Sequence, residues 1–93
     1  RWLLERGYEP QNIFIGGDSA GGNLTLVSLL KFRELGLPMP AGAVLISPWA
    51  DLTATGESLH ENAHHDPMIP VNVLKFLARV YGGETPRSDP MLS

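Results

Sequence analysis

Short apolar runs alternate with a helical pattern along the first half of the chain. Asn12–Gly17 (NIFIGG) is apolar with incomplete alternation, which is typical of a strand covered on both faces. From Ala20 to Gly36, leucines recur near helical spacing and also fill the opposite side, which predicts a mostly buried helix. The run Ala41–Trp49 (AGAVLISPW) predicts a second strand, which Pro48 ends. This order predicts a βαβ unit and therefore a parallel sheet.

Helical patterns also flank this unit. Arg1–Gly7 (RWLLERG) predicts the last turns of a helix that Gly7 closes. Pro70–Gly83 (PVNVLKFLARVYGG) has an apolar face, with Pro70 at the first helical position and a double glycine stop. The polar stretch Ala50–Asp66 predicts a loop with at most a short helix. The predicted fold class is α/β, with a parallel sheet and flanking helices.

Composition narrows the class of protein and its partners. The chain has 93 residues, of which 43% are hydrophobic and 18% charged, so at most one globular domain is expected. The net charge is −3 and the lysines and arginines are scattered, so nucleic acid is not an expected partner. The absence of cysteine excludes a disulfide framework and a thiolate metal site, and it leaves the cellular compartment undetermined. The longest apolar stretch, Ala41–Ala50, is too short to span a bilayer.

The two predicted strands are too few for a stable sheet, because each leaves an unpaired edge. We therefore expect further strands from sequence beyond these residues. The chain opens without methionine, at Arg1, and both ends read as cut.

Ser19 stands between the first predicted strand and the following helix, in the pattern Gly-x-Ser-x-Gly formed with Gly17 and Gly21. In this context the pattern is typical of a nucleophile elbow, a strained turn that raises a serine hydroxyl above the carboxyl ends of the strands. We expect the two glycines to supply room across the turn. The pattern predicts Ser19 as a catalytic nucleophile and the backbone N–H of Ala20 as a donor to the oxyanion.

Other roles for these glycines are less consistent with the sequence. A glycine-rich turn can serve packing alone or bind phosphate, but a phosphate-binding loop needs a lysine at a fixed spacing, and the next one is Lys31. The dinucleotide pattern Gly-x-Gly-x-x-Gly is not formed. The Gly-Asp-Ser-Gly of chymotrypsin-like proteases is interrupted by Ala20, and a long helix follows.

The remaining acids and histidines are interpreted as loop residues. The candidates by residue type are Asp51, Asp66, Asp89, His60, His64 and His65. Triad partners in this kind of fold come in the order Ser, acid, His at the ends of successive strands, and no further predicted strand separates Asp51 from the histidines. Asp18 adjoins Ser19 and cannot orient a distant imidazole, so a solvated or turn-bonding role is expected. The adjacent pair His64 and His65 project in different directions, so no metal site is expected there.

Three segments together resemble the hormone-sensitive-lipase-like group of α/β-hydrolase esterases: Gly16–Leu24 (GGDSAGGNL), Gly36–Thr53 (GLPMPAGAVLISPWADLT) and Ser88–Ser93 (SDPMLS). The resemblance implies that Ser19 is the nucleophile and that the amide of Ala20 is one oxyanion donor. In that group, two more donors come from an upstream His-Gly-Gly loop, and the triad acid and histidine follow later strands. Residues 1–93 would then be a partial catalytic domain, with one triad member and no activity alone.

By this resemblance the elbow comprises Gly17, Asp18, Gly21 and Gly22 around Ser19. The implied activity is that of a serine carboxylesterase or lipase-like hydrolase, which acts on a small ester through an acyl-enzyme and needs no cofactor. Trp49 is a candidate for the edge of the substrate pocket or for packing. Two alternatives stay open: a small-molecule receptor on the same scaffold, as in the plant gibberellin receptors, and a pseudoenzyme. Self-association also stays open.

Overall fold

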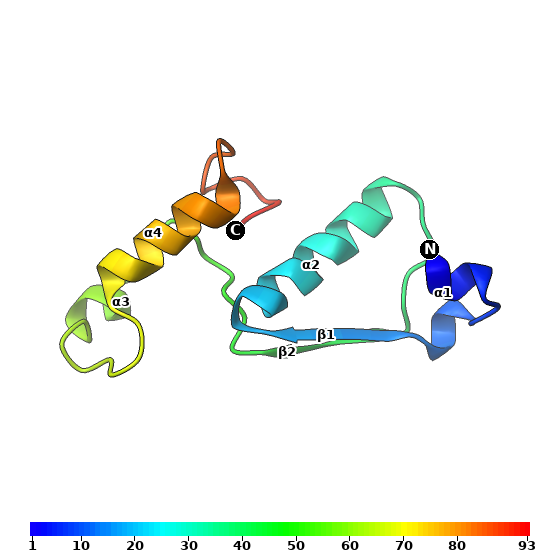
Figure 1. Ribbon diagram of the computed structural model, residues 1–93, viewed down its shortest axis with the longest axis horizontal. Coiled ribbons are helices and arrows are strands. Elements are labelled where there is room, and N and C mark those ends of the chain that lie inside the picture. Colours follow the sequence, from blue (N-terminus) through cyan, green and yellow to red (C-terminus); the bar gives the residue numbers. More distant parts are fainter. The chain divides into compact units, whose positions relative to one another are not determined.

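The computed structural model describes all residues from Arg1 to Ser93. They form two compact units, Arg1–Trp49 and Ala50–Ser93, whose α-helices and strands are labelled in Figure 1. No helix in either unit has both the length and the apolar character needed to cross a bilayer.

The first unit contains the predicted strand, helix and strand. Strands β1 (Phe14–Asp18) and β2 (Gly42–Ile46) pair in parallel, with Phe14 opposite Gly42 and Asp18 opposite Ile46. Helix α2 (Ser19–Glu34) connects the two strands and packs against both of them (Figure 1). The βαβ unit and the parallel sheet are therefore confirmed.

Two short helices precede β1 within the first unit. Helix α1 spans Trp2–Glu5, and Gly7 follows it with a φ of 87°, so the predicted glycine stop is confirmed. The 3₁₀ helix η1 (Pro10–Asn12) was not predicted; it begins at Pro10, whose ring fixes φ in the helical range.

The first unit is less buried than the apolar patterns predict. Phe14 on β1 and Ile46 on β2 are 68% and 63% exposed, and Leu24 on α2 is 56% exposed. Within residues 1–93, the expected cover on both faces of the strand and around the helix is therefore absent at these residues. The reason is geometric: α2 covers one face of a two-stranded sheet and uses one side of its own surface to do so.

The second unit contains helices α3 (Glu57–Glu61) and α4 (Val71–Gly82), close to the predicted short and long helices. Pro70 is the residue before α4 rather than its first residue, because its ψ of 144° is extended. A hydrogen bond of 3.0 Å from Arg87 to the carbonyl of Gly83 ties the tail to the end of α4.

Candidate active site

The chain turns from strand to helix at Ser19. Strand β1 is extended through Asp18, at φ −109° and ψ 151°, and α2 begins at the next residue. Ser19 itself has a φ of 50°, a left-handed conformation that a residue with a Cβ rarely adopts and that costs about 1–3 kcal/mol. The strained strand-to-helix turn expected from the sequence is therefore present.

Close backbone contacts explain why this turn contains glycines. A Cβ at Gly17 would lie 2.2 Å from the carbonyl oxygen of Gly21, and a Cβ at Gly22 would lie 2.8 Å from the Cα of Pro48. A Cβ at Gly21 would meet nothing nearer than a carboxylate oxygen of Asp18, at 3.9 Å. The expectation for Gly17 is thus confirmed. The expectation for Gly21 is wrong within this chain, because a Cβ there collides with nothing; Gly21 contributes the backbone that a side chain at residue 17 would strike.

The end of β2 is joined to the turn by two hydrogen bonds. The backbone N–H of Trp49 donates to the carbonyl oxygen of Ser19 at 2.9 Å, and Nδ2 of Asn23 donates to the carbonyl oxygen of Trp49 at 2.8 Å. Ser47 lies between β2 and Trp49 and has a φ of 42°. It is a second non-glycine residue in the strained left-handed region. The sequence analysis predicted a role for neither Asn23 nor Ser47. Two sequence features could have indicated them: Asn23 is an amide inside an apolar helix, and Ser47 precedes a proline directly after a strand.

The surroundings of Ser19 suit a nucleophile. Ser19 is exposed at the carboxyl end of β1, and it opens α2, whose first N–H groups have no acceptor within the helix. Asp18 is also exposed, as expected, and its side chain does not cap the helix. The N–H of Ala20 belongs to this first turn, at the positive end of the helix dipole. A hydroxyl and a set of backbone donors thus share one edge of the sheet.

The other candidate carboxylates serve local turns in the second unit. Asp51 accepts a hydrogen bond from the backbone N–H of Thr53, and Asp89 accepts one from that of Met91, both at 2.8 Å. The hydrogen bonds from Thr53 hold the pKa of Asp51 below its usual value. These contacts favour the interpretation of the acids as loop residues.

The histidines lie in the same unit and are all exposed: His60, His64 and His65. No group of three or more histidine, cysteine or acidic side chains is close enough together to hold a metal ion.

Asp66 gives a testable pH dependence. One of its carboxylate oxygens accepts the N–H of Met68 at 2.8 Å and that of Ile69 at 3.1 Å, and these bonds lower its pKa. The stabilisation is therefore present above the unfolded carboxyl pKa of about 3.9 and is lost as the pH falls through the lower folded value.

The matched variant is Asp66→Asn, which keeps the acceptor oxygen but does not titrate. We expect the melting temperature of the wild-type protein to fall more than that of the variant between pH 7 and pH 3, because only the wild type loses a charged acceptor. The difference should be small, because the carboxylate is exposed. Identical pH profiles in thermal melts would contradict this assignment.

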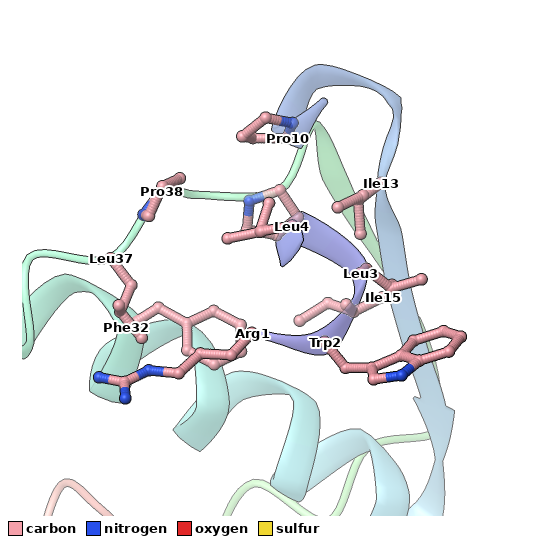
Figure 2. A pocket seen from close by; sticks show the side chains of 11 residues that line it. Arg1, Trp2, Leu3, Leu4, Pro10, Ile13, Ile15, Phe32, Leu37 and Pro38 are labelled. Carbon is pink, nitrogen blue, oxygen red and sulfur yellow. The ribbon is translucent and has the colours of Figure 1, made fainter. Parts of the chain in front are cut away.

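An apolar cavity of about 210 Å³ lies in the first unit, away from Ser19. Figure 2 shows its walls, which come from α1, η1, the start of β1 and the last turns of α2; they include Leu4, Pro10, Ile13, Phe32 and Leu37. Ile13 precedes β1, whereas Ser19 follows its last residue. The cavity is therefore at the opposite end of the strand and is not a substrate pocket for this turn. Trp49 is half-buried and does not line it, and its role as a pocket edge stays a prediction.

Comparison with known proteins gives consistent matches over the whole chain. A family model described as alpha/beta hydrolase fold matches residues 1–93. The crystal structure of an esterase from the bacterial hormone-sensitive lipase (HSL) family matches with a TM-score of 0.93 and 44% identity, over all of this chain and 31% of that one. A crystal structure described as EstE5-PMSF (I) matches with a TM-score of 0.88 and 44% identity, over all of this chain and 30% of that one.

The acetyl-hydrolase of Streptomyces hygroscopicus is 38% identical over 93 residues, which are all of this chain and 31% of that protein. The chain thus spans about a third of the length of these relatives.

Proposed function

Because the chain belongs to the α/β-hydrolase fold family and resembles its hormone-sensitive-lipase-like group, we propose that residues 1–93 are part of the catalytic domain of a carboxylic ester hydrolase. The observation that carries the proposal is Ser19, a non-glycine residue at φ 50° where a strand meets the amino end of a helix. That conformation exposes the hydroxyl at the edge of the sheet where substrates bind in open α/β folds.

The proposed reaction is acyl transfer through Ser19. The hydroxyl of Ser19 attacks the ester carbonyl carbon while a histidine beyond residues 1–93 of the same protein takes the hydroxyl proton. The carbonyl oxygen becomes an oxyanion. The histidine then protonates the leaving alcohol, which departs and leaves an acyl-serine. Water, activated by the same histidine, releases the acid and restores the serine. None of these steps requires a cofactor.

The residues around Ser19 have separate roles in this proposal. The N–H of Ala20 donates to the oxyanion, and its place in the first turn of α2 adds the favourable end of the helix dipole. Gly17 lets the strand pass the backbone of Gly21, and Gly22 lets the segment after β2 approach the turn. Asp18 is the last strand residue before the nucleophile and is not assigned to the triad.

The relatives support this chemistry and a class of substrate. EstE5 is described together with PMSF, a sulfonyl fluoride, and reagents of this class modify activated serine hydroxyls. The Streptomyces relative is described as an acetyl-hydrolase, which supports a short acyl group. We therefore propose small esters with short acyl chains as substrates.

Steady-state hydrolysis by the full-length parent protein tests the proposal. We expect continuous release of p-nitrophenolate from p-nitrophenyl acetate and butyrate, with a lower kcat/KM for a long-chain ester. A folded parent protein that binds small ligands but releases no p-nitrophenolate would contradict the proposal and favour the receptor alternative.

A further inference from the structure

We propose that Asn23 is a positioning residue that sets the direction of the Ala20 N–H in the oxyanion site. The inference rests on the proposed function and names how the same site is held in place. The proposed role of Asn23 requires no contact with the nucleophile's hydroxyl or with a substrate. It acts through the backbone of Trp49.

The contacts form a short series. Asn23 is 2% exposed, and its Nδ2 donates to the carbonyl oxygen of Trp49 at 2.8 Å. The N–H of the same Trp49 donates to the carbonyl oxygen of Ser19 at 2.9 Å. The buried amide of Asn23 on α2 therefore holds Trp49, which lies 26 positions further along the chain. Trp49 in turn binds the backbone of the turn.

Peptide geometry connects this series to the oxyanion site. The carbonyl of Ser19 and the N–H of Ala20 belong to one planar, trans peptide group, so their directions are fixed relative to each other. A hydrogen bond that orients the carbonyl of Ser19 therefore also orients the N–H of Ala20. The same bond polarises the peptide and makes that N–H a better donor.

The segment that brings Trp49 to the turn is held against local preference. Ser47 has a φ of 42°, and Pro48 approaches so closely that a Cβ at Gly22 would lie 2.8 Å from its Cα. Such backbone persists only where the surrounding contacts fix it. The hydrogen bond from Asn23 is one of those contacts, because it binds the carbonyl that directly follows this segment.

This arrangement predicts a particular kinetic effect. An oxyanion donor acts in the transition state, so its misalignment lowers kcat and leaves KM nearly unchanged. Removal of one such donor costs about 10²–10³-fold in kcat, and a misplaced donor should cost less. We expect Asn23→Asp to lower kcat by about 10–100-fold, because a carboxylate cannot donate to the carbonyl of Trp49.

The test uses the full-length parent protein in five forms: wild type, Asn23→Asp, Asn23→Ser, Ser19→Ala and the control Thr25→Val. Thr25 is also buried on α2, and its hydroxyl donates to a backbone carbonyl, that of Gly21, at 2.9 Å. The control thus removes a similar hydrogen bond that does not involve Trp49. Rate constants for p-nitrophenyl acetate are expressed per active site counted by burst titration, so that unfolded protein does not contribute.

A second measurement isolates the oxyanion site. A boronic acid forms a tetrahedral adduct with the serine, so its affinity should fall in parallel with kcat in both Asn23 variants, while KM stays within about twofold. We expect Thr25→Val to keep kcat and boronate affinity within about twofold, even if it melts at a lower temperature.

The outcomes separate this inference from the proposed function. Asn23 variants with unchanged kcat per titrated site, or with the same small loss as Thr25→Val, overturn the positioning role. If Asn23→Asp yields no titratable sites, Asn23→Ser decides by the same criterion. If Ser19→Ala keeps its activity, the proposed function itself fails; if Ser19→Ala is inactive and Asn23 variants are normal, only the present inference fails.

Discussion

Replacement of Ser19 by alanine is expected to lower kcat for p-nitrophenyl butyrate by about 10⁴–10⁶-fold in the full-length parent protein. The variant lacks the hydroxyl that forms the acyl-enzyme, while the backbone donors of the turn remain. Stopped-flow measurements should also show that the initial burst of p-nitrophenolate is absent. The affinity for a substrate-like inhibitor that forms no bond to the serine should change little, because the hydroxyl does little for ground-state binding.

Two controls make this result specific. Ser28→Ala removes a serine hydroxyl from the same helix α2, and its kcat should match wild type. Ser19→Gly should be as inactive as Ser19→Ala but melt at a higher temperature, because only glycine adopts a φ of 50° without strain. A folded Ser19→Ala protein with kcat within about tenfold of wild type would contradict the assignment of the nucleophile.

Gly17→Ala is expected to damage both folding and activity. Its new Cβ would lie 2.2 Å from the carbonyl oxygen and 2.3 Å from the carbonyl carbon of Gly21, so the backbone of the turn must move. Overpacking of this kind costs about 1–3 kcal/mol or more in free energy of unfolding. A displacement of about 1 Å at the nucleophile is expected to lower kcat by about 10²-fold.

Gly21→Ala is the matched comparison for stability, because its Cβ would meet only a carboxylate oxygen of Asp18 at 3.9 Å. In urea unfolding of the full-length protein, we expect the midpoint to fall clearly for Gly17→Ala and to stay near wild type for Gly21→Ala. Equal midpoints for the two variants would show that the close contact at Gly17 does not govern the turn.

The strand, the turn and the helix around Ser19 could be predicted because their signals are local. An apolar run, a Gly-x-Ser-x-Gly pattern and a helical repeat follow one another within a few residues, and each constrains the backbone directly. Gly7 illustrates the same point, because a helix end in the left-handed region favours glycine whatever the rest of the chain does.

The contacts that hold the turn could not be predicted in the same way. Asn23 meets the carbonyl of Trp49 only when β2 has paired beside β1, and the strain at Ser47 exists only because that strand end bends toward the turn. The predicted burial is not reached within residues 1–93 for a related reason. The apolar side chains of Phe14 and Leu24 favour burial, but the number of helices and strands that pack against them decides how much of each side chain is buried.

The most direct test of Ser19 as the nucleophile is mass spectrometry of the full-length parent protein after treatment with phenylmethylsulfonyl fluoride. We predict one sulfonyl group per chain, located by peptide mapping on Ser19, with esterase turnover lost in proportion to its incorporation. Full turnover with Ser19 completely modified, or loss of turnover with the group on another residue, would contradict the proposed mechanism.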